Sequence, residues 1–241
     1  MKSMRSDIMG LFLKFINNTR KPSGILGKIM IYSMNKGHAK MADWGIKHFP
    51  KIQFQNLLDI GCGGGRNALT LLKKYDCAHL TAVDYSPLCV EKTRQYNQQF
   101  IKEKRCDVLE ANVQALPFPS DSFEMATAFE TIYFWPGLED CFKEVYRVLS
   151  HEGYFCIVSE SDGEDAESQK YEKIIDGMHN YTLIQIKETL KKVGFKTIDC
   201  FHHEVKPWIA VIARKLCYLS LLKQRMELKC NVVEDNHDDR L

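Results

Sequence analysis

The sequence predicts an α/β fold with a doubly wound, mostly parallel sheet and helices on both faces. An apolar run at residues 57–60 leads into a glycine-dense turn and then into a helical pattern, which is how a strand–turn–helix unit of such a sheet begins. Strand-like and helix-like patterns then alternate to about residue 214. With 241 residues and 45% apolar content, the chain can bury the core of one domain.

The glycine-dense turn predicts a loop that holds a nucleotide-type ligand. Gly61, Gly63, Gly64 and Gly65 lack a Cβ atom, so a ligand can approach the backbone and the chain can adopt positive φ. The spacing matches the dinucleotide pattern G-x-G-x-x-G only in part, because Arg66 replaces the third small residue. We expect Arg66 to lie between helix and strand, which disfavours a nicotinamide dinucleotide without removing that alternative.

A second strand, residues 79–83, ends at an acid that suits a ribose. Asp84 follows the glycine loop at the interval at which such sheets place a carboxylate on ribose hydroxyls. A Ser-Pro pair then begins a helix expected over residues 86–100, because serine caps helix N-termini and proline suits the first turn. Asp84 and Tyr85 should therefore lie in the turn between strand and helix.

A third stretch, Ala-Asn-Val-Gln-Ala-Leu-Pro-Phe at residues 111–118, precedes a strand at 123–129 that ends before Glu130. Together with the Asp-x-Gly-x-Gly-x-Gly run at 59–65 and with Asp84, this stretch resembles the ordered motifs of the class I S-adenosylmethionine (SAM) dependent methyltransferases of the small-molecule type. The resemblance implies SAM as cofactor and a small-molecule methyl acceptor as partner. The cofactor-binding residues that it implies are Asp59, Gly61, Cys62, Gly63, Asp84, Tyr85, Asn112, Val113, Glu130 and Met34.

Two of these residues carry specific expectations. Asn112 stands where the family usually has Asp, so the adenine amino group would be accepted by an amide oxygen. Val113 would contact the adenine face, although a buried valine is more often ordinary core. Glu124 replaces another usual Asp, and we expect no consequence from that replacement.

The resemblance covers about residues 50–215 and implies a Rossmann-like, seven-stranded sheet whose last strand is antiparallel. Further strands are expected at 154–159, 196–204 and 208–214. The helices expected between them follow Pro136 and the capping-box residue Thr182. We expect residues 1–50 to form an N-terminal helical lid and residues 51–215 to form the SAM-binding domain, with an insertion at about 160–181 near the acceptor. Residues 216–241 are expected to be a C-terminal extension.

The acceptor side offers His38, Tyr133 and Glu160 as candidate catalytic residues. The sulfonium of SAM already makes its methyl group electrophilic, so the protein mainly aligns the acceptor, and a general base is needed only where the acceptor loses a proton. Glu130 is a further candidate base, and Glu160 with Asp162 could hold a cationic acceptor. The simpler interpretation, a surface histidine and solvated loop acids, stays open.

Charge and cysteine content indicate which partners, metals and compartment to expect. A net charge of +2 gives no electrostatic footprint for nucleic acid, so no such partner is expected. The nine cysteines include no C-x-x-C pair, which predicts reduced thiols, a cytoplasmic protein and no metal site. The apolar run at residues 8–16 is too short to span a bilayer, so we expect an amphipathic or docking helix and no stable membrane insertion.

Three function classes remain open on the residues alone. The first is methyl transfer from SAM to a small molecule by in-line displacement. The second is a NAD(P)-dependent oxidoreductase that uses the same loop and Asp84. The third is a SAM-binding protein without catalysis. The acceptor atom and the oligomeric state are not readable from the sequence.

Overall fold

The computed structural model describes residues 16, 18–76 and 78–217. The docking helix expected at residues 8–16 therefore lies almost entirely outside the described residues, and so does nearly all of the extension expected at 216–241.

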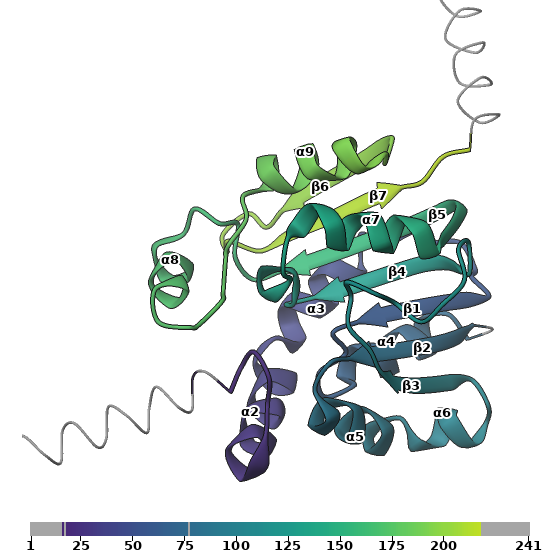
Figure 1. The fold of residues 1–241 in the computed structure, drawn as a ribbon, viewed down its shortest axis with the longest axis horizontal. Helices are drawn as coiled ribbons and strands as arrows, with labels where there is room; N and C mark the ends of the chain where they lie inside the picture. Colours follow the sequence, from purple (N-terminus) through teal and green to yellow (C-terminus); the bar gives the residue numbers. More distant parts are fainter. Residues whose placement is uncertain (1–15, 17, 77, 218–241) are drawn as a thin grey trace, which may run out of the picture.

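The sheet has seven strands in the order β3-β2-β1-β4-β5-β7-β6 (Figure 1). Strands β1 to β5 pair in parallel, and β7 is antiparallel to both of its neighbours. Chain order reverses direction between β1 and β4, so their carboxyl ends open a crevice. The bounds are β1 Asn56–Ile60, β2 His79–Asp84, β3 Cys106–Glu110, β4 Phe123–Phe129, β5 Leu149–Ser159, β6 Thr197–His202 and β7 Ile209–Arg214. The predicted fold class, with its antiparallel last strand, is confirmed.

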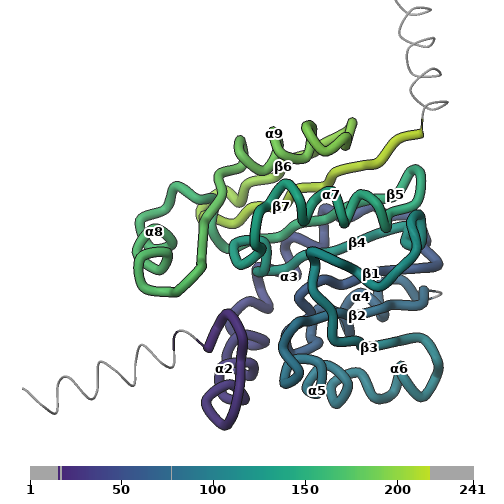
Figure 2. The backbone as a smooth tube through the Cα atoms, viewed as in Figure 1, coloured from purple at the N-terminus to yellow at the C-terminus, as the bar shows by residue number. Residues whose placement is uncertain are grey.

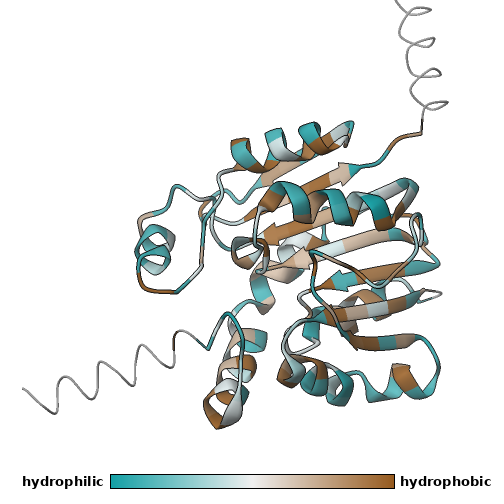
Figure 3. Ribbon diagram, in the orientation of Figure 1, coloured by the Kyte–Doolittle hydropathy of each residue, from teal (hydrophilic) through white to brown (hydrophobic). Residues whose placement is uncertain are grey.

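Helices cover both faces of this sheet and enclose two apolar cores. One core lies between the sheet and α7 and α9, and the other lies between the sheet and α3, α4 and α5. The strands are largely brown in the hydropathy view (Figure 3), as expected for a sheet buried on both faces. The helices are α2 Gly24–Gly37, α3 Ala39–Ile46, α4 Arg66–Lys74, α5 Pro87–Tyr96, α6 Gln98–Lys102, α7 Leu138–Val148, α8 Ala166–Glu172 and α9 Leu183–Val193.

Two predicted elements differ from the structure, and one strand was not predicted. The helix expected over residues 86–100 is two helices, because the Asn97 side chain turns inward and donates to the carbonyls of Gly65 and Thr93. The strand expected at 154–159 begins earlier, at Leu149, which pairs with Phe123 ahead of a register shift. The edge strand β3 had no range predicted from the sequence, and three of its five residues, Asp107, Leu109 and Glu110, are exposed.

The helices α2 and α3 precede the first strand, and their role as a lid stays a prediction. α2 ends at Gly37 and α3 follows at once, as the break in the apolar pattern at that glycine predicts. α3 packs closely on β5, since a Cβ atom added at Gly45 would meet the Val158 side chain at 2.4 Å. The tube in Figure 2 shows α2 beside α5, away from the middle of the sheet.

Candidate active site

A cavity of about 370 Å³ lies at the carboxyl ends of β1, β2 and β4 and is closed from one side by α2. Its size suits a small-molecule ligand. All of the predicted cofactor-binding residues except Asp59 line it, and so does His38. These wall residues come from five stretches of sequence far apart in the chain. The predicted residues in the wall are Met34, Gly61, Cys62, Gly63, Asp84, Tyr85, Asn112, Val113 and Glu130.

The glycine loop exposes its backbone to this cavity. Gly61, Gly63 and Gly65 all have positive φ, at 74°, 54° and 79°, a region that side chains with a Cβ atom rarely adopt. A Cβ atom added at Gly61 would meet Thr131 Oγ1 at 2.3 Å, whereas one added at Gly63 would have no atom within 4 Å. The open space at Gly63 is the cradle into which a ligand can fit against the backbone.

Two side chains of the following helical segment hold the loop, and sequence reasoning missed both. Thr93 Oγ1 donates to the Gly63 carbonyl at 3.0 Å, and Asn97 Nδ2 donates to the Gly65 carbonyl at 3.0 Å. Both residues are fully buried although they are polar. A sequence feature that could have indicated this role is that Thr93 and Asn97 are polar residues four positions apart, a spacing that places both on the side facing the loop.

Asp84 joins the loop to the end of β2. Its Oδ2 atom accepts the Gly63 N–H at 2.9 Å and its Oδ1 atom accepts the Ser86 N–H at 2.9 Å. Burial raises the pKa of this carboxyl group, while those N–H groups act in the opposite direction. The Tyr85 N–H and the Cys89 thiol also act on this carboxyl group. Asp84 lines the cavity, so the expectation of a ribose contact is compatible with its position.

Asp59 does not line the cavity, so its predicted direct contact with a cofactor is not supported. The residue is only 1% exposed and lies in β1 behind the loop, where its Oδ1 atom accepts the Thr127 hydroxyl at 2.7 Å. Its Oδ2 atom has no partner among the described residues. Burial raises the pKa of Asp59 to about 7, and the nearby Asp84 charge adds to the shift.

The expected position of Arg66 is wrong. The residue begins α4, but its side chain turns toward α3 and forms an ion pair with Asp43, with Nη2 and Oδ1 2.6 Å apart. It therefore does not separate helix from strand. The steric argument against a nicotinamide dinucleotide falls with this result, and that alternative has to be tested by binding.

The two residues expected to contact adenine, Asn112 and Val113, both line the cavity. Asn112 is exposed, and its Oδ1 atom already accepts the Gln114 N–H at 3.1 Å. Val113 is 7% exposed and belongs to a core cluster while also lining the cavity. Glu124, in contrast, caps the start of β1 by accepting the backbone N–H groups of Gln55 and Asn56.

A short N-terminal segment fastens α2 over the cavity. The Tyr85 hydroxyl donates to the Arg20 carbonyl, and Ser86 Oγ donates to the Pro22 carbonyl at 2.9 Å. From α2 itself, Asn35 Nδ2 donates to the Gly64 carbonyl at 3.1 Å. These contacts anchor the lid at both the loop and the end of β2, so the segment at 19–22 also lines the cavity.

The three catalytic candidates gather around Glu130. His38 Nε2 lies 3.5 Å from Glu160 Oε2, and the Tyr133 hydroxyl donates to Glu130 Oε2 at 3.1 Å. Glu130 Oε1 accepts the Glu160 N–H. Glu130 has a positive φ of 52°, which is uncommon for a residue with a side chain and occurs often at functional sites.

This cluster is acidic with one imidazole. Removal from water raises the pKa of Glu130, which the facing His38 opposes. Single ligand atoms of His38, Glu130 and Glu160 lie within 4.8 Å of one another, which is a donor set of the kind that cations accept. The expectation of no metal site stays a prediction.

Of the three neighbouring aromatic residues Tyr133, Phe134 and Trp135, the last two line the cavity. Trp135 is also core, because it packs between the rings of Phe142 and Phe155. Tyr133 directs its hydroxyl to Glu130.

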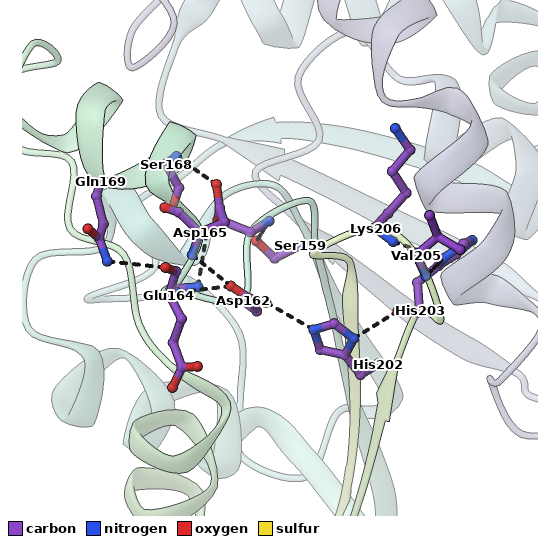
Figure 4. A network of polar contacts seen from close by, with 12 residues as sticks. Ser159, Asp162, Glu164, Asp165, Ser168, Gln169, His202, His203, Val205 and Lys206 are labelled. Atoms are coloured by element: carbon purple, nitrogen blue, oxygen red, sulfur yellow. Dashed lines mark hydrogen bonds and ion pairs between the residues drawn. The ribbon is translucent and has the colours of Figure 1, made fainter.

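Asp162 does not join the cluster around Glu130. Its Oδ2 atom pairs with His202 Nε2 of β6 at 3.0 Å, and its Oδ1 atom accepts the N–H groups of Glu164 and Asp165 (Figure 4). The pair raises the pKa of His202. Asp162 therefore ties the loop after β5 to the β6–β7 hairpin, and the idea that it holds a cationic acceptor is not supported.

Comparison with known proteins agrees with this geometry. The family model described as "Methyltransferase domain" matches residues 58–157. The chain is 28% identical over 179 residues to cycloartenol-C-24-methyltransferase of Arabidopsis thaliana, covering 67% of this chain and 53% of that protein. It is 32% identical over 102 residues to the chloroplastic 2-methyl-6-phytyl-1,4-hydroquinone methyltransferase 2 of Oryza sativa subsp. japonica, covering 42% of this chain and 28% of that protein.

The comparison with solved structures concerns the fold alone. The crystal structure of a SAM-dependent methyltransferase from Aquifex aeolicus aligns with a TM-score of 0.66 at 16% identity, over 77% of this chain and 97% of that one. Residues 58–157 thus match a methyltransferase domain model, and the fold is that of a solved SAM-dependent methyltransferase. It spans about half the length, or less, of the two curated relatives named above.

Proposed function

We propose that this protein binds SAM in the cavity below α2 and transfers its methyl group to a small-molecule acceptor. The observation that carries the proposal is the convergence of four separated motifs on one cavity, with the backbone of the glycine loop open to it at Gly63. The curated relatives are named as methyltransferases of sterols and of a phytyl hydroquinone, which supports a small-molecule acceptor.

The residues divide the cavity into two sides. On the cofactor side, the loop would receive the amino-acid part, Asp84 the ribose hydroxyls, and Asn112 with Val113 the adenine. When bound, SAM would supply an electrophilic methyl group on its sulfonium centre. α2 and Phe134 would exclude water from the space between the two ligands.

On the acceptor side, Glu130 and His38 would meet the second substrate. Two carboxylates, those of Glu130 and Glu160, face one imidazole, so this side disfavours an anionic acceptor and suits a neutral or cationic one. His38, held next to Glu160, would accept a proton from an acceptor that must lose one. Tyr133 would act through Glu130, because its hydroxyl is directed there.

A reducing compartment such as the cytoplasm is part of the same proposal. Five described cysteines are buried free thiols: Cys62, Cys89, Cys106, Cys141 and Cys156. Among the described residues, no helix is long and apolar enough to cross a membrane.

Label transfer tests the function directly. The protein is incubated with SAM labelled in its methyl group and with a metabolite extract fractionated by polarity and charge. We expect label in a neutral or cationic fraction and loss of that transfer in His38→Gln. Binding of labelled SAM without transfer to any fraction would favour a non-catalytic SAM-binding protein, and binding of NADH in place of SAM would favour an oxidoreductase.

A further inference from the structure

The outer face of α2 is apolar and basic at once. Ile25 is 77% exposed, Ile29 is 52% exposed and Tyr32 is 71% exposed. Lys28 and Lys36 are exposed as well. These five residues stand at positions 25, 28, 29, 32 and 36. With 3.6 residues per turn, this spacing places all five side chains on one side of the helix. This set of five residues is called the α2 outer face below.

The opposite side of α2 is occupied by the protein itself. Gly27, Met30 and Ile31 are buried, and Met34 lines the cavity. Close approach of the chain at Gly27 shows how tight this packing is, because an added Cβ atom would meet the Pro22 backbone at 2.9 Å. The helix therefore already packs on the protein through its opposite side, so the exposed apolar residues of the outer face are not needed for that packing.

The sequence segment that contains α2 carries only basic charges. Residues 8–42 contain no Asp or Glu. The whole chain has a net charge of only +2, so the rest of the chain is net negative. Exposed apolar residues among lysines are typical of helices that lie in the headgroup region of anionic membranes. The basic residues in this stretch are Lys14, Arg20, Lys21, Lys28, Lys36 and Lys40.

We propose that the α2 outer face docks on the surface of an anionic phospholipid bilayer. Ile25, Ile29 and Tyr32 would enter the headgroup region, and Lys28 and Lys36 would contact lipid phosphates. The docking is peripheral, which agrees with the absence of a membrane-spanning helix among the described residues. It would place the wall of the cavity, formed by the inner side of α2, next to the lipid phase.

Charge complementarity favours lipid over two other occupants. A second copy packed symmetrically on this face would bring Lys28 and Lys36 against the same lysines, which repel. The apolar segment at residues 8–16 carries Lys14 and no acid, so it offers the α2 outer face no opposite charge. Anionic headgroups supply both an apolar layer and negative charge.

Vesicle co-sedimentation of the full chain tests the proposal without any methyl acceptor. We expect binding to vesicles of phosphatidylcholine with phosphatidylserine, little binding to phosphatidylcholine alone, and loss of binding at high salt, where exposed charges are screened. Ile29→Glu and the double variant Lys28→Glu/Lys36→Glu should each weaken binding at least about tenfold. Ile184→Glu on α9, a position 66% exposed, is the matched control and should bind like the wild type.

Three results would overturn the proposal. The first is equal binding by wild type and both α2 variants, with circular dichroism showing all of them folded. The second is loss of binding only when residues 1–15 are removed, which would assign docking to that segment. The third is a dimer that Ile29→Glu dissociates in sedimentation velocity without vesicle binding by the wild type, which would make α2 an interface between two copies.

Discussion

Asp59 is a buried carboxyl group held behind the ligand loop, and its environment determines its protonation. One oxygen accepts the Thr127 hydroxyl, and the other has no partner among the described residues. Burial raises its pKa to about 7, so the folded protein keeps the proton at pH values where the unfolded chain has lost it. The stabilising state of this residue is therefore the neutral one.

The stability of the protein should reflect this shift in a definite direction. Between about pH 4 and pH 7 the folded state binds more protons at Asp59 than the unfolded state, so this group lowers the free energy of unfolding as pH rises. Asp59→Asn removes the titration, so its stability relative to wild type should increase over that range by a few kcal/mol, to order of magnitude. Urea unfolding at several pH values measures it, and a difference that does not change with pH would contradict it.

Asp84 combines a structural and a proposed binding role. Asn at this position can accept only through one atom, so Asp84→Asn loses the acceptor for Gly63 or Ser86 and weakens the contact expected with the ribose. A lost hydrogen bond to a charged group is worth about 1.5–3 kcal/mol, so affinity for S-adenosylhomocysteine should fall about tenfold or more. Calorimetry measures it, with the exposed Asp199→Asn as control, and unchanged affinity would contradict the role.

Among single residues, the sequence predicts those that line the cavity better than those that hold the loop in place. Short motifs placed Gly63, Asp84 and Val113 in the cavity wall. Thr93 and Asn97, which hold the loop, were not found, because their partners are backbone carbonyls that no side-chain pattern marks. Asp59 was misplaced because it lies in the motif but faces the interior.

The loop between β1 and α4 is the element on which the site depends, and two glycines in the chain allow a controlled test of it. Gly63 and Gly24 have similar φ values of 54° and 61°, and an added Cβ atom has no neighbour within 4 Å at either position. Only Gly63 lines the cavity. The two positions therefore differ in ligand access and not in backbone strain.

Replacing each glycine with alanine should separate the two effects. Both Gly63→Ala and Gly24→Ala should lose about 1 kcal/mol of stability, because alanine is strained at positive φ. Only Gly63→Ala should also weaken S-adenosylhomocysteine binding, because its methyl group occupies ligand space. Thermal unfolding with and without ligand measures both effects, and equal ligand responses in the two variants would exclude the loop as the ligand cradle.

The loop after β5 is held by a pH-dependent contact. Asp162 is the main cause of the raised His202 pKa, and the His203 carbonyl adds to it (Figure 4). The stabilisation is present at acidic pH and is lost as pH rises through that pKa. Asp162→Asn should bring the His202 pKa back toward its ordinary value in an NMR titration of the imidazole protons. An unchanged titration midpoint would show that the pair does not form in solution.

Elements with a strong periodic pattern were predicted within a residue or two, and the others required tertiary contacts. The capping box at Thr182 and Gln185 fixed the start of α9. The early start of β5 at Leu149 depends on pairing with Phe123, which no local pattern encodes. The break between α5 and α6 depends on Asn97 reaching another segment of the chain.

Across the whole molecule, one crevice of the sheet is bounded by the N-terminal helix α2. The sheet order brings the ends of β1, β2 and β4 together, and α2 closes the cavity through the bond from Asn35 to Gly64. The same helix carries the α2 outer face on its other side. Lid closure and membrane docking would therefore share one element.

The central claim is that this cavity is a SAM site, and titration calorimetry with S-adenosylhomocysteine tests it most directly. The account predicts saturable binding at one site per chain, with a higher unfolding temperature in the presence of ligand. No heat and no change in unfolding temperature with either S-adenosylhomocysteine or SAM would contradict it.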